Sequence, residues 1–421
     1  MLSNLNRLKE YVEGEKTVYL YGAGLYASGL IIFLKKSDIG VKACIVSNVD
    51  DNPDSVDGVP VCGLSDVFNE GALIIAIKKG QMAILETVIG KFSKVVLLDA
   101  GMQRELTEIR YQNACNDVTA DYYLTANKEM LEKGMQLMVD KRSGETLFRV
   151  GCAYSVEKLK GTLCFCTREI FEKDYGKLQI LPLTETGASY HELERVGIYV
   201  AGGRGSRYDL RGEVGNLRFP ITVGAALSGG DEGFLSDSRG ENISDRNHDY
   251  SECTALYWIW KNTRGQRYVG LEHYRRRLEL NKAGISYIMD NDIDLVVALP
   301  QYIILPVKEF FLDGRMSKRD WEYMVRYIKK YDVGYEECIN CYEQSYIYIS
   351  CNLCLFKREW FERYCEFAFE VAFNIEEEYK RYNVVRGDRY MGYIFENLLS
   401  LFIMRHKDVL NIRYTGVDWL S

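Results

Sequence analysis

The sequence predicts an α/β protein built from two α/β domains. Over the first hundred residues, short apolar runs rich in β-branched side chains alternate with helical stretches, which is typical of a parallel sheet covered by helices. The first of these runs enters a glycine-rich turn that opens a helix. A second group of apolar strands begins near residue 196, and a length of 421 residues suits two or three domains. We predict a Rossmann-like domain over 1–101, a mixed α/β connector over 102–195 and a second α/β domain over 196–421.

The N-terminal domain is predicted from one apolar helix and several strands. Residues 16–24, KTVYLYGAG, form a strand that runs into the glycine turn, and the helix follows over 25–34. Further strands are predicted over 41–48, 58–61, 72–77 and 94–100.

The glycine turn matches a dinucleotide-binding fingerprint only in part. Gly22, Gly24 and Ala27 occupy its three small-residue positions, but the acid expected about 20 residues later is missing. Asp50 and Asp51 are the nearest carboxylates. The turn could cradle a phosphate at the helix N-terminus, or it could serve only the close packing of the strand on its helix. Both interpretations stay open, and the incomplete fingerprint argues against NAD as a cofactor.

The connector carries no catalytic motif. Its pattern predicts helices over 101–114 and 125–141, and short strands over 147–152, 161–166 and 177–183.

The C-terminal domain opens with GIYVAGG (197–203), an apolar strand that ends in a loop of small residues. Apolar and aromatic side chains recur at the spacing of one helical face over 253–260, so we predict a helix there, with Ser251 or Asp249 as its N-cap. A strand over 268–271 comes next. Its end delivers a cluster of polar side chains, namely Glu272, His273, Tyr274, Arg275 and Arg276.

The stretch from 240 to 277 carries a long ordered motif. Its parts are an Asn-Ile-Ser loop (242–244), Tyr250, ECTALYWIWKN (252–262) and YVGLEHYRR (268–276). These residues resemble a family of bacterial glycosyltransferases that build capsular and lipopolysaccharide chains, long catalogued as a domain of unknown function. Further matches extend the resemblance over 196–421, namely FPITVGA (219–225), SCNLCLFKREWF (350–361) and RGDRYMGYIFENLL (386–399).

The resemblance implies a nucleotide-sugar transferase domain of the A type. Such an enzyme would move a hexose, with galactose from UDP-galactose as the best match, to a growing lipid-linked surface glycan. This chain departs from the family after the first strand, where Ala201, Gly202 and Gly203 replace an expected Thr-His-Lys, and this puts the nucleotide contacts of that loop in doubt. Two other functions stay open: a nicotinamide-dependent sugar-nucleotide enzyme that uses the turn at 22–27, and a non-catalytic subunit of a polysaccharide assembly complex.

Glycosyl transfer needs a base or nucleophile near the anomeric carbon, neutralisation of the departing diphosphate, and a groove for the acceptor. Candidate catalytic residues are Glu252, His273, Asp388 and Glu396; candidate donor-binding residues are Asn242, Ser244, Arg275, Arg276 and Arg389; the candidate acceptor-binding residue is Asn352. Structural roles compete with these assignments. Glu252 would be favoured at a helix N-terminus in any case, Asn242 and Ser244 are turn formers, and Arg389 could form a buried pair with Glu396, seven residues further on one helix face.

The charge of the diphosphate can be met by Mn²⁺ or Mg²⁺, or by arginines. The usual Asp-x-Asp metal motif is replaced by Glu272, His273 and Tyr274, so Glu272 and His273 are the metal candidates, and Arg275 and Arg276 are the alternative to a metal.

A CxxC-x9-CxxC spacing, formed by Cys338, Cys341, Cys351 and Cys354, suggests zinc. However, the residues around the second pair favour a strand, on which side chains three apart point to opposite faces. We therefore expect no zinc.

The net charge and the cysteine content restrict the kinds of partner and the cellular location that we expect for the protein. A net charge of −7 argues against nucleic acid, and 12 scattered cysteines suit the reduced thiols of the cytoplasm. The first residues are polar, and no apolar run is long enough to span a bilayer. We expect a cytoplasmic protein that contacts the inner face of the cell membrane peripherally, where it meets a lipid-linked acceptor.

Overall fold

The computed structural model describes residues 4–67, 71–77, 80–88, 90–106, 109, 122–125, 135–140, 146–150, 166–167, 178–179, 181–183, 195–230, 233–302, 306–312, 314–345, 347–384, 386 and 389–420. Its contacts divide the chain into two units, Met1–Ala120 with Glu309–Glu322, and Asp121–Lys308 with Tyr323–Ser421. The predicted domain boundaries at 101/102 and 195/196 stay predictions. No helix within the described residues combines the length and the apolar composition that crossing a membrane requires.

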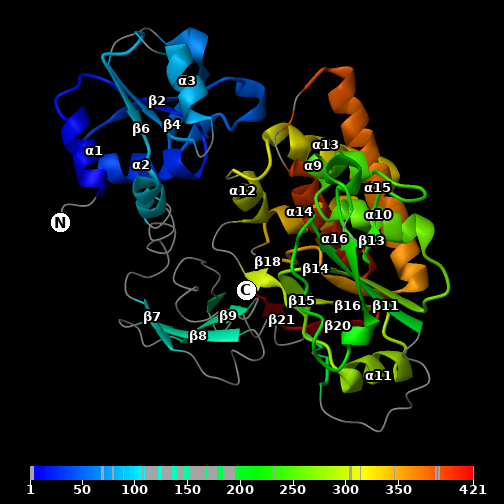
Figure 1. Cartoon of the computed structure of the whole chain (residues 1–421). Coiled ribbons are helices and arrows are strands. Elements are labelled where there is room, and N and C mark those ends of the chain that lie inside the picture. The colour runs from blue at the N-terminus through cyan, green and yellow to red at the C-terminus, as the bar shows by residue number, and fades with distance from the viewer. Residues whose placement is uncertain are drawn as a thin grey trace. The chain divides into compact units, whose positions relative to one another are not determined.

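The first unit contains a six-stranded sheet in the order β3-β4-β2-β1-β5-β6 (Figure 1). Its strands are β1 Val18–Tyr21, β2 Val41–Val46, β3 Ser55–Val56, β4 Val59–Gly63, β5 Ala72–Ile75 and β6 Lys94–Leu97. All neighbours are parallel except β3 and β4. The five parallel strands therefore follow the order third, second, first, fourth, fifth, which is that of a Rossmann fold.

Helices cover both faces of this sheet. α1 (Asn4–Val12) and α2 (Leu25–Lys35) pack on the face that receives Val18 and Leu20, whereas α3 (Gln81–Val88) packs on the face that receives Tyr19 and Tyr21. Successive strand residues point to opposite faces, so an all-apolar β1 serves both layers. The predicted Rossmann-like domain is confirmed.

A four-stranded antiparallel sheet, in the order β10-β9-β8-β7, is formed by residues that lie in sequence between β6 and β11. Its strands are β7 Tyr122–Thr125, β8 Met135–Asp140, β9 Thr146–Val150 and β10 Cys166–Thr167. The helix predicted over 125–141 is wrong for 135–140, because β8 pairs with a strand on each side. Ladder pairing with neighbours that are distant in sequence overrides local helix propensity.

The second unit is built on a nine-stranded mixed sheet in the order β13-β12-β11-β14-β19-β16-β20, with β15 and β21 added beside β14. The strands are β11 Val196–Gly202, β12 Arg218–Thr222, β13 Leu235–Ser236, β14 Tyr268–His273, β15 Arg276–Leu278, β16 Leu295–Ala298, β19 Cys354–Lys357, β20 Ile412–Thr415 and β21 Val417–Trp419. β11 to β14 run parallel, and β19 runs against them. This mixed α/β sheet agrees with the nucleotide-sugar transferase fold that the resemblance implies.

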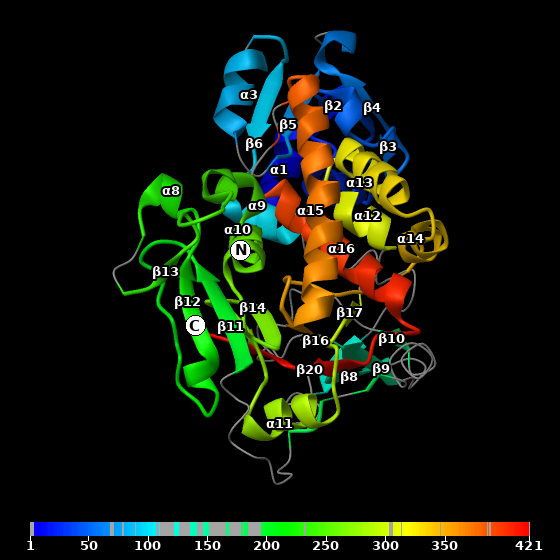
Figure 2. The same cartoon turned by 90° about the vertical axis from the view of Figure 1, so that its right-hand side faces the viewer.

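Helices again cover both faces of the second sheet. α10 (Cys253–Asn262), α15 (Arg358–Arg381) and α16 (Tyr390–His406) pack on one face, where Phe356 of β19 stacks on Tyr364 of α15 at 5.3 Å between ring centroids. α11 (Lys282–Asp290) packs on the opposite face with Leu355. Figure 2 shows the long α15 running beside α16.

The remaining described helices and strands complete the two units. They are α8 Ala225–Ser228, α9 Asn247–Tyr250, β17 Gln301–Tyr302, α12 Val307–Leu312, α13 Lys318–Tyr331, α14 Tyr335–Glu343 and β18 Ile347–Tyr348, with short 3-10 turns at Val49–Asp51, Leu64–Asp66, Gly215–Leu217 and Ser244–Arg246.

The predicted helix over 253–260 is confirmed as α10, but its predicted N-cap is wrong. Glu252 is the residue before the helix, and no side chain caps it. Asp249 belongs to the preceding helix α9, and Ser251 separates the two helices with a left-handed backbone (φ 51°). The positive φ of Ser251 interrupts the helical backbone, so α9 ends before it and α10 begins after it.

The last strand of the chain completes the sheet beside β14. β15 forms a tight hairpin with β14, and β21 pairs antiparallel with β15, so that Arg276 lies opposite Trp419 and Leu278 opposite Val417. The backbone N–H of Leu420 also donates to the carbonyl of Arg275. This three-strand corner fixes the backbone of the arginine cluster.

Candidate functional site

A polar cavity of about 380 Å³ lies at the carboxyl ends of β11 and β14. These strands are parallel, with Ala201 opposite His273, so their ends meet at one edge of the sheet, where α/β folds place ligands. The cavity is lined by Ala201, Gly202, Gly203, Ser206, Val223, Asn247, His248, Ser251, Glu252, His273, Tyr274, Arg275 and Arg389. Glu252, His273, Arg275 and Arg389 are thus brought together, as expected for one site.

Glycines form the floor of the cavity. A Cβ on Gly202 would lie 2.6 Å from the hydroxyl of Tyr208 and 2.9 Å from Cβ of Ser206, so a larger residue would have to displace them. Gly203 faces open space. The close approach of Tyr208 thus requires a small residue at position 202, whereas Gly203 has room for a side chain.

His273 ends β14 as a neutral ring of defined tautomer. The backbone N–H of Arg275 donates to its Nδ1 at 3.2 Å, so the ring proton is on Nε2. Burial, with the nearby positive charges of Arg276, Arg275 and Arg389, lowers the pKa of His273 to about 3. The ring of His273 therefore carries an N–H at Nε2.

This tautomer gives a direct prediction for His273. Glutamine can place an N–H close to the position of Nε2, whereas asparagine mimics the Nδ1 side of the ring. We expect His273→Gln to retain most affinity for a phosphate-bearing ligand and His273→Asn to lose about tenfold or more, in line with one hydrogen bond to a charged group. The folded pKa is lowered, so the ring stays neutral well above pH 3, and affinity should show no step from His273 between pH 5 and pH 8. Titration calorimetry across that range, with ¹⁵N histidine spectra, measures both; an Nδ1-protonated ring would contradict the assignment.

Strained backbone surrounds the cavity. Among the described residues, non-glycine side chains with left-handed backbone include Ser251 (φ 51°), Cys351 (φ 72°), Asn352 (φ 53°) and Arg389 (φ 67°). Ser251 and Arg389 line the cavity, and Asn352 contacts Glu252. Such conformations persist where surrounding structure enforces them, and they gather at functional sites.

Glu252 is held from behind by the buried Asn352. The amide of Asn352 donates to Oε1 of Glu252 at 3.0 Å and to the carbonyl of Gly392 at 3.3 Å. Asn352 does not line the cavity among the described residues, so the structure places this candidate acceptor residue behind the carboxylate.

Arg389 and Glu396 do not share a helix face. Arg389 precedes α16, its Nε donates to the hydroxyl of Ser251 at 3.1 Å, and its backbone N–H donates to the carbonyl of His248. Glu396 lies inside the helix and accepts the backbone N–H of Cys351 at 3.0 Å. The structure thus separates the two, with Arg389 at the cavity; Asp388 lies outside the described residues.

Ser244 and Asn242 have structural partners. Ser244 is fully buried, donates to Asp237 and accepts the backbone N–H of Ala226. Asp237, also fully buried, further accepts from Thr254 at 2.6 Å and from the backbone of Gly224 and Ala225. Asn242 donates to the carbonyls of two neighbouring loop residues. These bonds tie the loop that leads into α9 to the start of α10.

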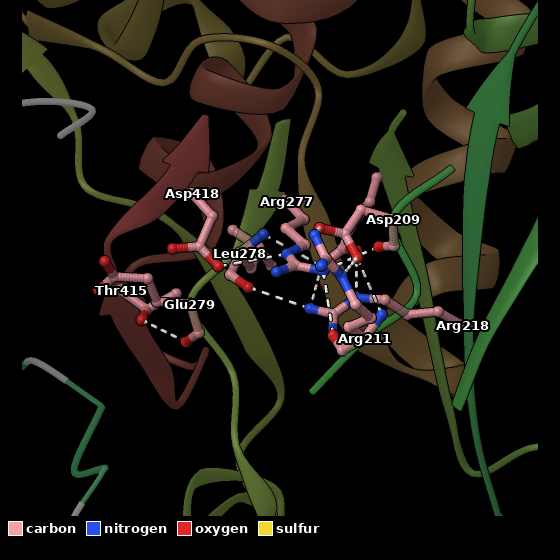
Figure 3. A network of polar contacts seen from close by, with 9 residues as sticks. Asp209, Arg211, Arg218, Arg277, Leu278, Glu279, Thr415 and Asp418 are labelled. Carbon is pink, nitrogen blue, oxygen red and sulfur yellow. Dashed lines mark hydrogen bonds and ion pairs between the residues drawn. The ribbon is translucent and has the colours of Figure 1, made fainter. Parts of the chain in front are cut away.

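The carboxylate of Glu272 is enclosed in the protein core. Arg218 donates to both of its oxygens, at 2.7 and 3.2 Å, and the backbone N–H of Leu278 donates at 3.0 Å. Burial raises the pKa of Glu272, while Arg218 and the Leu278 amide favour the ionised form. Figure 3 shows the adjoining network, in which Arg277 joins the side chain of Asp418 to the carbonyls of Asp209 and Arg211.

Mn²⁺ or Mg²⁺ does not fit the pair Glu272 and His273. The oxygens of Glu272 are taken by Arg218 and Leu278 inside the core, and Nδ1 of His273 accepts an amide N–H while Nε2 holds the ring proton. Arg276 does not line the cavity in the described part of the chain, whereas Arg275 does, with its guanidinium 5.1 Å from the ring of Tyr274.

The four cysteines of the zinc-like spacing occupy three different elements. Cys338 and Cys341 lie on α14, Cys351 lies in a left-handed turn, and Cys354 begins β19. The continuous strand expected around Cys351 is therefore wrong, because the turn at 351–352 interrupts it. Within the described ranges, no group of three or more His, Cys, Asp or Glu side chains could hold a metal ion.

In the first unit, the glycine turn is closely packed. A Cβ on Gly22 (φ 119°) would lie 2.8 Å from the carbonyl of Ala76, so a side chain does not fit there. Gly24 precedes α2, which has no side-chain cap, and Ala27 is fully buried within the helix. The close approach of Gly22 satisfies the packing interpretation, and phosphate binding stays a prediction.

Several lining residues were not predicted from the sequence. Asn247, His248, Ser206 and Tyr274 enter the cavity from α9, from the loop after β11 and from the β14–β15 hairpin. His248 and Asn247 lie between two parts of the matched motif, 242–244 and Tyr250, and resemble loop residues in composition. Their position next to Ser251 and Glu252 is the only local signal that could have identified them.

Comparisons with known proteins identify similarity over part of the chain. A family model described as a domain of unknown function (DUF4422) matches residues 208–407. A comparison with curated proteins found no match. Among solved structures, the apo form of WbbM, a bifunctional glycosyltransferase, aligns with a TM-score of 0.46 and 21% identity over 54% of this chain. The alignment spans 45% of that protein, less than half of its length.

Proposed function

We propose that this protein is a glycosyltransferase that moves a hexose from a nucleotide-sugar donor to a glycan acceptor in bacterial surface polysaccharide synthesis. UDP-galactose is the proposed donor, and a lipid-linked glycan is the proposed acceptor. The catalytic site is the cavity at the ends of β11 and β14.

One observation carries the proposal: the cavity joins phosphate-binding groups to a carboxylate at a strand edge. Gly203 has open space beside it and allows a ligand to approach the backbone closely, and Arg275 and Arg389 supply positive charge for a diphosphate. Glu252 lies in the same cavity, where it can face a sugar. The motif over 240–277, which resembles transferases of surface glycans, supplies Glu252 and Arg275.

The residues have distinct roles in this proposal. Arg389 and Arg275 stabilise the negative charge that develops on the leaving diphosphate, and His273 donates its Nε2 proton as a hydrogen bond to the same group. Glu252, held by Asn352, orients the donor sugar through its hydroxyls. Glu272 takes no part in the transfer in this proposal; its buried pair with Arg218 stabilises the fold.

Donor binding by the full-length protein tests the proposal. We expect UDP-galactose or a related sugar nucleotide from a panel with UDP-glucose and GDP-mannose to raise the melting temperature. A ligand at a hundred times its Kd stabilises the folded state by about 2.7 kcal/mol. Glu272 and His273 do not fit a metal ion, so EDTA should leave this shift in melting temperature unchanged. NADH serves as the control; stabilisation by NADH alone would contradict the proposal and favour the nicotinamide-dependent alternative.

A further inference from the structure

We propose that His248 is the general base of the transfer, and that Asp249 orients its ring; this inference rests on the proposed transferase function. In the step, the acceptor O–H bond breaks and its proton passes to Nε2 of His248. The acceptor oxygen bonds to the anomeric carbon, and the bond from that carbon to the diphosphate breaks, with its electron pair leaving on the diphosphate.

The position of His248 suits a group that meets the acceptor. It lines the same cavity as Glu252 and His273, but its side chain is 66% exposed, whereas Ser251 is buried and His273 is partly buried. Because the ring is exposed, an acceptor glycan can approach it from solvent. Arg275 and Arg389, the proposed contacts of the donor diphosphate, line the same cavity.

The ring of His248 faces a carboxylate on its Nδ1 side. Nδ1 lies 3.4 Å from Oδ1 of Asp249, a separation that is common for catalytic hydrogen bonds before a ligand tightens them. With its proton on Nδ1 toward Asp249, the ring presents Nε2 as the proton acceptor. A carboxylate that holds a histidine in this tautomer is the arrangement found in base-activated enzymes.

The backbone that carries His248 is fixed at several points. Its carbonyl accepts the backbone N–H of Arg389 at 3.0 Å. At the two ends of α9, Arg246 and the buried Tyr250 both donate to Glu376, at 2.8 and 3.2 Å. A short helix held at both ends keeps the imidazole at one place relative to the cavity, which general-base catalysis requires.

The other titratable groups of the cavity are less suited to this role. Nδ1 of His273 accepts the amide of Arg275, which makes its Nε2 a donor, and Glu252 is less exposed than His248 and accepts the amide of Asn352. Among the described residues, the charged groups around the His248–Asp249 pair include Arg246, Glu252, Glu376, Arg386 and Arg389. Glu252 is thus the alternative base that an experiment must distinguish.

The test compares variants of the full-length protein in hydrolysis of UDP-galactose, where water replaces the acceptor hydroxyl, and in donor binding by calorimetry. His248→Gln is expected to keep the donor Kd within about twofold and to lose about 10² to 10⁴ in turnover. Added imidazole should restore part of the activity of His248→Ala.

Matched variants make the outcomes distinct. His406→Gln, in a histidine packed against Trp360 and Phe402 at the end of α16, should retain turnover. Asp249→Asn should lower turnover less than His248→Gln, because it disturbs only the orientation of the ring. If His248→Gln turns over normally, if imidazole does not restore His248→Ala, or if Glu252→Gln and not His248→Gln loses turnover at an unchanged donor Kd, the base assignment is overturned while donor binding stands. If the wild type binds no sugar nucleotide, the transferase proposal itself fails.

Discussion

Replacing Arg389 by lysine is expected to lower turnover by about 10² to 10³ without unfolding the protein. The guanidinium reaches the cavity from a left-handed residue and is oriented by the hydroxyl of Ser251 at 3.1 Å. Lysine keeps the charge and experiences the same backbone strain, but it lacks the planar group that binds two phosphate oxygens at once. Loss of a group that stabilises charge in the transition state typically lowers turnover by factors of this size.

Arg381→Lys is the matched control for Arg389→Lys. Arg381 lies at the end of α15, its side chain is 63% exposed, and it pairs with Glu378 on its own helix. Arg381 is exposed, and the buried Glu378 keeps Arg326 and Tyr327 as partners, so turnover should stay near that of the wild type. Steady-state kinetics with thermal unfolding curves measures both variants. Wild-type turnover in Arg389→Lys would show that Arg389 only supports the fold.

Replacing Glu272 by glutamine is expected to destabilise the second unit by about 3 to 5 kcal/mol, because the charge of Arg218 would remain buried without its partner. The pair is almost fully enclosed, and Glu272 also accepts the backbone N–H of Leu278, which begins the turn away from β15. Guanidinium unfolding followed by tryptophan fluorescence reports mainly on this unit, since Trp258, Trp260, Trp360 and Trp419 lie in it and Trp321 lies in the first unit.

A double variant separates the loss of the ion pair from the loss of packing at Glu272. Arg218→Met combined with Glu272→Leu removes both charges, and buried ion pairs replaced by apolar residues are often neutral for stability. We therefore expect the double variant to recover most of the stability that Glu272→Gln loses. An unchanged unfolding midpoint in Glu272→Gln would contradict the buried-pair interpretation.

The sequence predicted those parts of the fold that depend on local periodicity. The strand–turn–helix from β1 to α2, the amphipathic α10 and the apolar β14 all follow from patterns within one element. The helix expected where β8 lies failed because two distant strands decide that segment. The N-cap predicted at Ser251 or Asp249 was wrong. The hydroxyl of Ser251 accepts the Nε–H of Arg389, which lies 138 residues away in sequence, and such a contact leaves no local pattern.

The residues of the candidate site also fall into those that local sequence predicts and those whose contacts depend on distant segments. Glu252, His273 and Arg275 could be predicted, since groups at the ends of parallel strands and adjoining helices converge at one edge. Ser244 is a candidate donor-binding residue, and in the structure it bonds Asp237, whose partners come from three separate segments. Arg277 forms an ion pair with Asp418, which lies 141 residues away in sequence. Such partnerships leave no pattern in a single sequence.

The pairing of β15 with β21 also has a consequence for how the protein is made. Arg277 and Asp418, which face each other across this pairing, are 141 residues apart in sequence. Contacts of such separation form late, because the loop between them must be closed first. During synthesis, the hairpin that presents His273 and Arg275 stays without its third strand until residues 417–420 have left the ribosome. The hairpin that lines the cavity therefore takes its final shape only after this distant segment has been made and has paired with it.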